Sequence, residues 1–153
     1  MNTIMIIIAK YFYIISVLGI VILFFTQPKI KQKGLLICAA IIAPLSYIIA
    51  KLSGLIYYDP RPFVEGNFIP LIAHSADNGF PSDHVLLTAA IAMIIWFYNK
   101  KISYLFWLVA ILIGISRVYT GIHHITDIIG SIVIVIVSGL VYYFINKKYF
   151  VNK

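Results

Sequence analysis

The chain has 153 residues, of which 62% are hydrophobic and 11% are charged, and its net charge is +7. A water-soluble domain of this length exposes a large share of its surface and cannot hide so many apolar side chains. The composition excludes an ordinary soluble fold. It predicts an all-α polytopic transmembrane helix bundle, with residues 1–153 forming one integral membrane domain.

Five apolar runs approach the roughly 20 residues that a helix needs to cross a bilayer core. The predicted spans are, in chain order, about Ile4–Thr26, Gly34–Tyr57, Ser82–Tyr98, Ile102–Tyr119 and Ile122–Ile145. The third and fourth are short, so we expect their polar terminal residues to lie at the membrane surface. No small-residue cleavage site is evident after the first apolar run, which indicates a retained span.

Lysines cluster between the spans, and five alternating spans bring them to one side of the membrane. They are Lys29, Lys31, Lys33, Lys100, Lys101, Lys147, Lys148 and Lys153. The excess of basic residues in cytoplasmic loops identifies this side as the cytoplasm. The same bias explains the positive net charge better than nucleic-acid binding does, so we expect no nucleic-acid partner.

All the acidic residues and all the histidines fall in or beside the opposite, extracytoplasmic segments. They are Asp59, Glu65, Asp77, Asp83, Asp127, His74, His84, His123 and His124. This segregation predicts a polar site at the outer surface of the membrane. The single cysteine, Cys38, lies inside an apolar run, permits no intrachain disulfide and is expected to be a core residue.

Arg61 lies between Pro60 and Pro62, just beyond the second span. Proline stops a helix and fixes the direction of the chain, so Arg61 can present its fork of donors to a phosphate. The alternative is an anchor to lipid headgroups, because arginine is enriched at membrane interfaces. Taken alone, this motif favours the alternative.

Ser82, Asp83 and His84 begin the third span. Ser82 is suited to be an N-cap, and the free backbone N–H groups of a helix N-terminus bind anions. His84, about one turn into the helix, can donate a proton near neutral pH. An ordinary capped helix with an interfacial histidine explains this motif equally well.

The stretch from Ser116 to Asp127 carries most of the remaining polar residues. His123 and Asp127 are four residues apart, so they share one face of a helix. Asp127 can accept a hydrogen bond from one ring nitrogen and leave the other free to attack. Arg117 ends the fourth span before a turn that Gly121 permits, and an arginine at this depth is costly unless it is paired. The alternative is a purely structural His–Asp hydrogen bond.

A metal site is disfavoured by the same residues. Adjacent histidines on a helix, such as His123 and His124, point about 100° apart, and a metal site needs three or four converging ligands. Arg61 and Arg117 would repel a cation. We therefore expect no metal, and His124 is not expected to be catalytic.

Together the three clusters resemble the type 2 phosphatidic acid phosphatase (PAP2) superfamily of membrane lipid phosphatases. Its third signature, SR-x5-H-x3-D, is met by Ser116, Arg117, His123 and Asp127. The second, PSGH in most members, is PSDH here at residues 81–84, which is similar to the bacitracin-resistance undecaprenyl-diphosphate phosphatases. Residues 60–64 and 74–80 are similar to that subgroup as well, and the resemblance covers about Lys51 to Gly130.

The resemblance implies that His123 is a nucleophile that forms a phosphohistidine, oriented by Asp127, and that His84 protonates the leaving group. The phosphate-binding set that we expect is Arg61, Arg117, Ser82, Asp83 and Lys51. The family requires no metal or other cofactor. The first signature, K-x6-RP, would place a lysine at Gly54, and Lys51 lies one helical turn earlier, from where it can snorkel to the same surface. Five predicted spans also depart from the six that are usual in the family.

The resemblance favours undecaprenyl diphosphate as substrate over phosphatidate or phosphatidylglycerophosphate, with a role in lipid-carrier recycling and bacitracin resistance. The expected partners are this lipid and the surrounding membrane lipids. A non-catalytic lipid or anion transporter is the alternative from another class, but transporters typically show an internal repeat of their spans, and the sequence has none. We expect His74 and Asp77 to brace the loop between the second and third spans, because irregular backbone needs internal hydrogen bonds.

Overall fold

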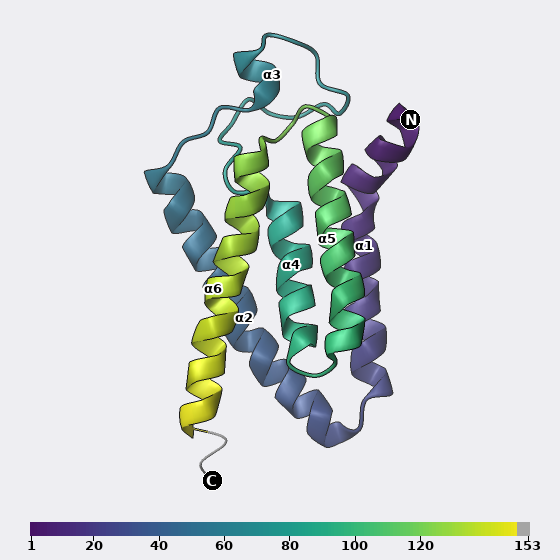
Figure 1. The fold of residues 1–153 in the computed structure, drawn as a ribbon, viewed down its shortest axis with the longest axis vertical. Helices are drawn as coiled ribbons and strands as arrows, with labels where there is room; N and C mark the ends of the chain where they lie inside the picture. The colour runs from purple at the N-terminus through teal and green to yellow at the C-terminus, as the bar shows by residue number, and fades with distance from the viewer. Residues whose placement is uncertain (150–153) are drawn as a thin grey trace.

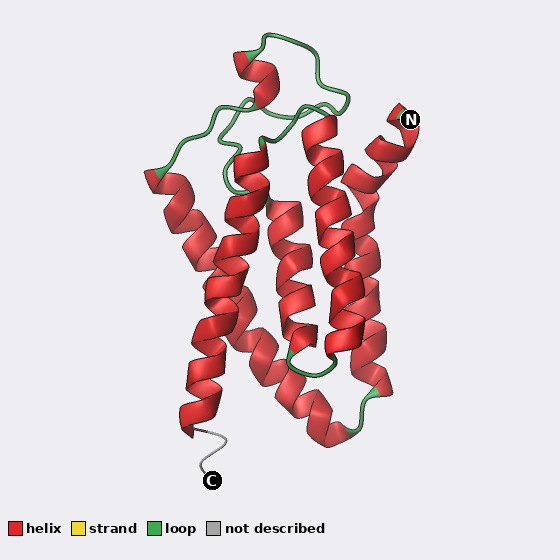
Figure 2. Cartoon of the chain, viewed as in Figure 1, coloured by secondary structure: helices red, strands yellow, loops and turns green. Residues whose placement is uncertain are grey.

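The computed structural model describes residues 1–149. These residues form helices joined by loops, with no strand among them (Figure 2). The helices are α1 (Asn2–Thr26), α2 (Lys29–Ile56), α3 (Pro62–Glu65), α4 (Asp83–Trp96), α5 (Lys100–Tyr119) and α6 (Ile125–Tyr149). The predicted all-α class is confirmed, with five long helices in one bundle and the short α3 outside it.

The five bundle helices run alternately up and down, so the chain connections fall at two ends (Figure 1). One end, which we call the loop end, carries Met1, α3 and the α5–α6 connection. The other, which we call the lysine end, holds the basic residues of the α1–α2 and α4–α5 connections and the end of α6. These are Lys29, Lys31, Lys33, Lys100, Lys101 and Lys147; Lys153 lies outside the described residues. The acids and histidines gather at the loop end, as predicted.

Four helices, α1, α2, α5 and α6, are long and apolar enough to cross a membrane. α4 has 14 residues, which is about 21 Å at 1.5 Å per residue. The fifth span is predicted to begin at Ile122, whereas α6 begins at Ile125. The reason is the turn at Gly121, whose φ of +77° delays the start of the helix.

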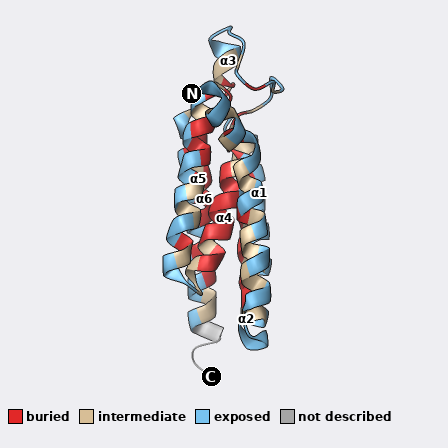
Figure 3. Ribbon diagram, turned by 90° about the vertical axis from the view of Figure 1, so that its right-hand side faces the viewer, coloured by how far each residue is buried: buried red, intermediate tan, exposed pale blue. Residues whose placement is uncertain are grey.

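α4 occupies the centre of the bundle, where it contacts α1, α2, α5 and α6. Most of its side chains are buried, as Figure 3 shows. Ala89, Ala90 and Ala92 are at most 5% exposed, and such small residues let neighbouring helices approach closely. The outer helices instead present large apolar side chains, such as Ile4, Leu18 and Ile22 on α1, that suit contact with lipid.

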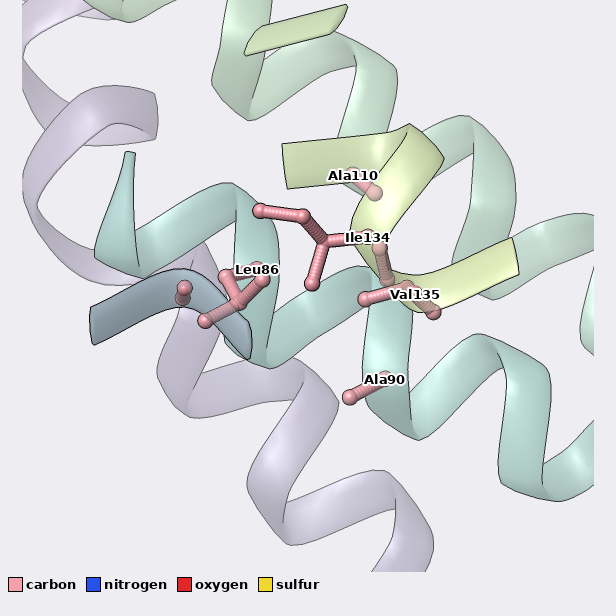
Figure 4. Close-up of a cluster of buried hydrophobic side chains, with 7 residues drawn as sticks. Leu86, Ala90, Ala110, Ile134 and Val135 are labelled. Carbon is pink, nitrogen blue, oxygen red and sulfur yellow. The ribbon is translucent and has the colours of Figure 1, made fainter. Parts of the chain in front are cut away.

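Figure 4 shows the cluster in which α2, α4, α5 and α6 meet. It consists of Ala50, Leu86, Ala89, Ala90, Ala110, Ile134 and Val135. Small and branched side chains alternate in it, which gives close packing without polar atoms. A second cluster lies nearer the lysine end and contains Cys38, which is fully buried, so its predicted place in the core is confirmed.

Residues 66–82 lead the chain from α3 down to the start of α4, which lies below the outward ends of α5 and α6 (Figure 1). Phe80, near the end of this loop, packs edge-on against Tyr57 at 5.0 Å between ring centroids. Its ring also covers Gly130 of α6, where an added Cβ would lie 2.2 Å from Phe80 Cε2. Ser82, at the end of this loop, is fully buried in the protein.

We predict that Gly130→Ala lowers the melting temperature of the detergent-solubilised protein. The Phe80 ring is held against Tyr57 and cannot yield to the new methyl group, and overpacking of this kind costs about 1–3 kcal/mol. Gly139→Ala is the matched control on the same helix. Its Cβ would meet Met93 Sδ at 2.6 Å, and a flexible thioether chain can move aside. Equal melting temperatures for the two variants would contradict this role of Gly130.

Candidate active site

The predicted site residues converge on one cavity of about 370 Å³ at the loop end of the bundle. Six of the eight line it, namely Lys51, Arg61, Asp83, His84, Arg117 and His123. The other two, Ser82 and Asp127, are fully buried directly behind its wall. A larger depression of about 710 Å³ lies on the outer surface and is lined mainly by apolar side chains; of the eight residues it includes only His123.

His123 is held by Asp127 from behind. The distance from His123 Nδ1 to Asp127 Oδ2 is 2.9 Å, and the two side chains are 2% and 0% exposed. The same carboxylate oxygen accepts the backbone N–H of His124 at 2.9 Å, as an acidic residue in the first turn of a helix commonly does. His123 itself precedes α6, so the predicted contact forms although His123 lies outside the helix.

The other ring nitrogen of His123 faces two arginines. Arg61 Nη1 lies 3.4 Å from His123 Nε2, and Arg117 Nη2 lies 3.3 Å from it. A guanidinium group can only donate, so Nε2 must be the accepting nitrogen and Nδ1 carries the proton that is donated to Asp127. The geometry therefore assigns the tautomer in which Nε2 carries the lone pair, on the side of the ring that faces the two guanidinium groups.

Arg61 is fixed by its neighbours as well as by the prolines beside it. Its Nε donates to Asp77 Oδ1 at 2.8 Å, and its Nη1 donates to the carbonyl oxygen of Ile122 at 2.8 Å. Pro62 occupies the first turn of α3, and Arg61 is the N-cap residue of that helix. With 5% exposure, Arg61 has little surface left to contact a lipid headgroup, which argues against the lipid-anchor alternative.

Arg117, in the last turn of α5, donates from Nη1 to the carbonyl oxygen of Ala9 in α1 at 3.2 Å. Its Nε is buried and has no partner within residues 1–149, and the same holds for Ser82 Oγ. A buried donor without a partner costs free energy. An anion in the adjoining cavity would remove that cost for Arg117.

Ser82 occupies the N-cap position of α4, but its side chain makes no capping hydrogen bond. That part of the sequence prediction is wrong, because the Oγ turns into the protein interior. The backbone N–H groups of Asp83, His84 and Val85 have no partner inside the helix, so they still form an anion-binding terminus. His84 is the second residue of α4 and not a full turn into it. An ionised Asp83 carboxylate cannot donate to a phosphate, so only its backbone N–H suits the predicted binding role.

Asn78 is a structural residue of the site that the sequence analysis missed. Its Oδ1 accepts the backbone N–H groups of Asp59 at 2.9 Å and Phe80 at 3.0 Å. Its Nδ2 donates to the carbonyl oxygens of Gly54 at 2.9 Å and Tyr57 at 3.0 Å. The Asn78 side chain thus uses its whole hydrogen-bonding capacity to tie the loop of residues 66–82 to the end of α2. The only sequence signal for this role is that Asn78 lies between the Arg61 motif and the motif at residues 81–84.

Lys51 and Gly54 lie one turn apart on α2, and both line the cavity. A Cβ at Gly54 would lie 3.1 Å from the backbone oxygen of Phe80, so the loop packs directly on the glycine backbone. This contact explains why no long side chain stands at the position of the family's lysine. Lys51 Nζ lies 5.3 Å from the centroid of the Tyr47 ring, beside the cavity.

The remaining histidines point in different directions. His124 Nε2 lies 3.1 Å from the carbonyl oxygen of Pro60 and 3.3 Å from Glu65 Oε2. The His124 ring therefore faces α3 and does not line the cavity. His74 lines the cavity, with its ring centroid 6.3 Å from that of His123. Asp77 holds Arg61, which is the bracing contact that we expect for this loop.

Among residues 1–149, no group of three His, Cys, Asp or Glu side chains is arranged to hold a metal ion.

Comparison with known proteins places these features in a family. Residues 33–150 match the PAP2 superfamily. The chain belongs to this superfamily. It is 32% identical to undecaprenyl-diphosphatase BcrC of Bacillus subtilis, over 94% of this chain and 74% of that protein. It is 30% identical to the bacitracin transport permease protein BcrC of Bacillus licheniformis, over 97% of this chain and 73% of that protein.

The fold has a solved counterpart in the crystal structure of LpxE from Aquifex aeolicus. The TM-score is 0.71 and the sequence identity is 22%, over 92% of this chain and 83% of that chain. At this identity the likeness concerns the fold alone, and it supports the all-helical bundle. The matched PAP2 residues begin at position 33, inside α2, so α1 lies outside the segment that defines the family.

We predict that His123 becomes protonated only at a lower pH than an ordinary histidine, whose pKa is ~6.5. Burial of the ring lowers the pKa of His123, and the charges of Arg117 and Arg61 lower it further, against the raising effect of Asp127. Protonation therefore requires a pH below the ordinary range. Nitrogen NMR of histidine-labelled protein, assigned with His123→Gln, measures this titration. Removing one positive charge with Arg61→Gln should move the pKa upward, and a His123 signal with the ordinary pKa contradicts the prediction.

Proposed function

We propose that the protein is a metal-independent membrane lipid phosphatase that transfers the terminal phosphate of undecaprenyl diphosphate to His123 and then to water. The observation that carries this proposal is the environment of the His123 ring. One nitrogen is hydrogen-bonded to a buried carboxylate, and the other lies 3.3–3.4 Å from two guanidinium groups. A neutral nucleophile therefore stands where a phosphate would be bound.

In the first step His123 Nε2 attacks the terminal phosphorus, and the bond from phosphorus to the bridging oxygen breaks. The electron pair stays on the bridging oxygen, which takes a proton from the ring of His84 and leaves as the lipid monophosphate. His123 now carries positive charge, and the hydrogen bond from Nδ1 to Asp127 stabilises it. Phosphoryl transfer depends mainly on positioning and charge stabilisation, which these residues supply.

In the second step a water molecule attacks the phosphohistidine. His84, left neutral by the first step, accepts the proton of that water, and the bond from His123 Nε2 to phosphorus breaks. Inorganic phosphate leaves, and both histidines return to their starting protonation. One histidine therefore acts first as an acid and then as a base.

The phosphate oxygens would be held by donors on several sides. Arg61 and Arg117 provide guanidinium donors, and Arg117 Nε has no other partner within the described residues. The N-terminus of α4 adds backbone N–H groups. The buried Ser82 hydroxyl stands behind this terminus, and Lys51 reaches the cavity from α2.

Undecaprenyl diphosphate is the substrate that we favour, because the Bacillus subtilis relative is named for that activity and PSDH replaces PSGH here. The role would be recycling of the cell-wall lipid carrier, with resistance to bacitracin as a consequence. Phosphatidate and phosphatidylglycerophosphate are the alternative substrates. The lysine end would face the cytoplasm of a bacterium, which puts the site at the extracytoplasmic face of the inner membrane and makes residues 1–153 one phosphatase domain.

Detection of a phosphoenzyme tests the proposal. With undecaprenyl diphosphate radiolabelled at its terminal phosphate, we expect an acid-labile, alkali-stable adduct. His123→Ala should abolish both the adduct and phosphate release, a loss of several orders of magnitude. The control is His124→Ala, because that neighbouring ring faces α3; it should form the adduct normally. Transport of the lipid without any adduct would support the transporter alternative, and activity in His123→Ala would falsify the assignment.

We also predict that Lys51→Ala weakens binding of the diphosphate substrate about 10-fold, the effect of losing one hydrogen bond to a charged group. Gly54→Lys should not restore binding in the Lys51→Ala protein, because its Cβ would press on the backbone oxygen of Phe80 at 3.1 Å. Lys10→Ala, on the exposed side of α1, serves as the control. Recovery of the Michaelis constant in the double variant would show that the lysine position is not constrained by this loop.

A further inference from the structure

α1 packs along α5 at several levels, although it falls outside the matched PAP2 segment. Near its start, Asn2 Oδ1 accepts a hydrogen bond from Tyr119 Oη at 2.9 Å. Lower down, the Ala9 carbonyl accepts from Arg117. Lower still, Gly19 lets Phe106 of α5 approach so closely that a Cβ would lie 2.7 Å from its ring. These contacts fix how far α1 can slide along α5.

The contact at Ala9 connects α1 directly to the phosphate-binding set. Ala9 is fully buried, and in an α-helix its carbonyl also accepts the N–H of the residue four positions on, which is Tyr13. A carbonyl oxygen has two lone pairs, so it can serve both donors. Arg117 is therefore joined to the helical turn that carries Tyr13.

Tyr13 in turn contacts the proposed proton donor. Its ring stands edge-to-face with the ring of His84, at 4.8 Å between centroids and an interplanar angle of 85°. This geometry is the favourable one for aromatic pairs. Tyr13 packs in the cluster that contains Val85. Val85 is fully buried and directly follows His84 in the chain. The backbone at His84 and the Tyr13 ring are thus held in one packed unit.

The histidines around the site are fixed in different ways. His123 is oriented by Asp127, and His124 by the Pro60 carbonyl. The hydrogen bonds found across residues 1–149 include none to the ring of His84. Its orientation therefore depends on packing, and the Tyr13 ring is the aromatic group that supplies it.

We propose that Tyr13 is a positioning residue, which holds the His84 ring in the orientation that delivers a proton to the leaving oxygen. This inference rests on the proposed function, in which His84 delivers a proton to the leaving oxygen. Tyr13 acts through His84 and does not itself touch the reacting atoms. α1 is then part of the active site, and not only a membrane anchor beside it.

A double-mutant cycle distinguishes this role from simple packing. The rate of phosphoenzyme formation is measured in a single turnover with terminally radiolabelled undecaprenyl diphosphate. Tyr13→Leu should slow it about 10-fold, part of the 10²–10⁴-fold that a general acid contributes. In the His84→Ala protein, Tyr13→Leu should have no further effect. Tyr13→Phe keeps the ring and should restore the rate.

Phe12→Leu is the matched control, because Phe12 lies on the same helix and packs in the same cluster. Its effect should be equal with and without His84. If Tyr13→Leu does not fold, Tyr13→Met provides the same comparison. An equal effect of the Tyr13 change in both backgrounds overturns the positioning role. A His84→Ala protein with an unchanged rate overturns instead the proton-donor role in the proposed function, and this inference with it.

Discussion

Two buried guanidinium groups that face one imidazole ring impose the main electrostatic constraint on this fold. Arg61 and Arg117 are 5% and 4% exposed, and two like charges in a poorly polarisable interior repel each other and lose hydration. Asp77 and the backbone oxygens of Ile122 and Ala9 accept some of their hydrogen bonds, but Arg117 Nε has no partner within the described residues. These acceptors come from a loop, a turn and α1, so the site exists only where the three meet. The positive charge that remains is the reason for an anionic ligand.

Much of this arrangement could be predicted because its signals are local in the sequence. Long apolar runs bounded by lysines define the helices and their direction. The four-residue spacing of His123 and Asp127 places the carboxylate within reach of the ring, and Arg117 falls in the last turn of α5. The prediction that His124 points elsewhere follows from helical geometry, although the ring in fact precedes the helix. Periodicity and spacing were sufficient for these features.

The remaining features depend on contacts between distant parts of the chain. Asn78 ties its loop to Gly54, 24 positions earlier, and Arg117 reaches the carbonyl of Ala9, 108 positions away. Backbone carbonyls have no sequence signature, so neither contact could be read from residue types. For Ser82 the sequence does carry a local signal, but the signal is misleading. Its residue type and position predict a cap, but burial under the loop turns its hydroxyl away. Tertiary packing overrides a local preference in that case.

α4 is too short to cross a bilayer core of roughly 30 Å by itself, yet it packs against four other helices and most of its side chains are buried. The length rule for a membrane span applies to surfaces that meet lipid, so a central helix is free to end early. The first residues of α4 line a cavity that polar and apolar side chains share. Water is the second substrate of any hydrolysis, and the turns that α4 lacks leave room for it within the protein.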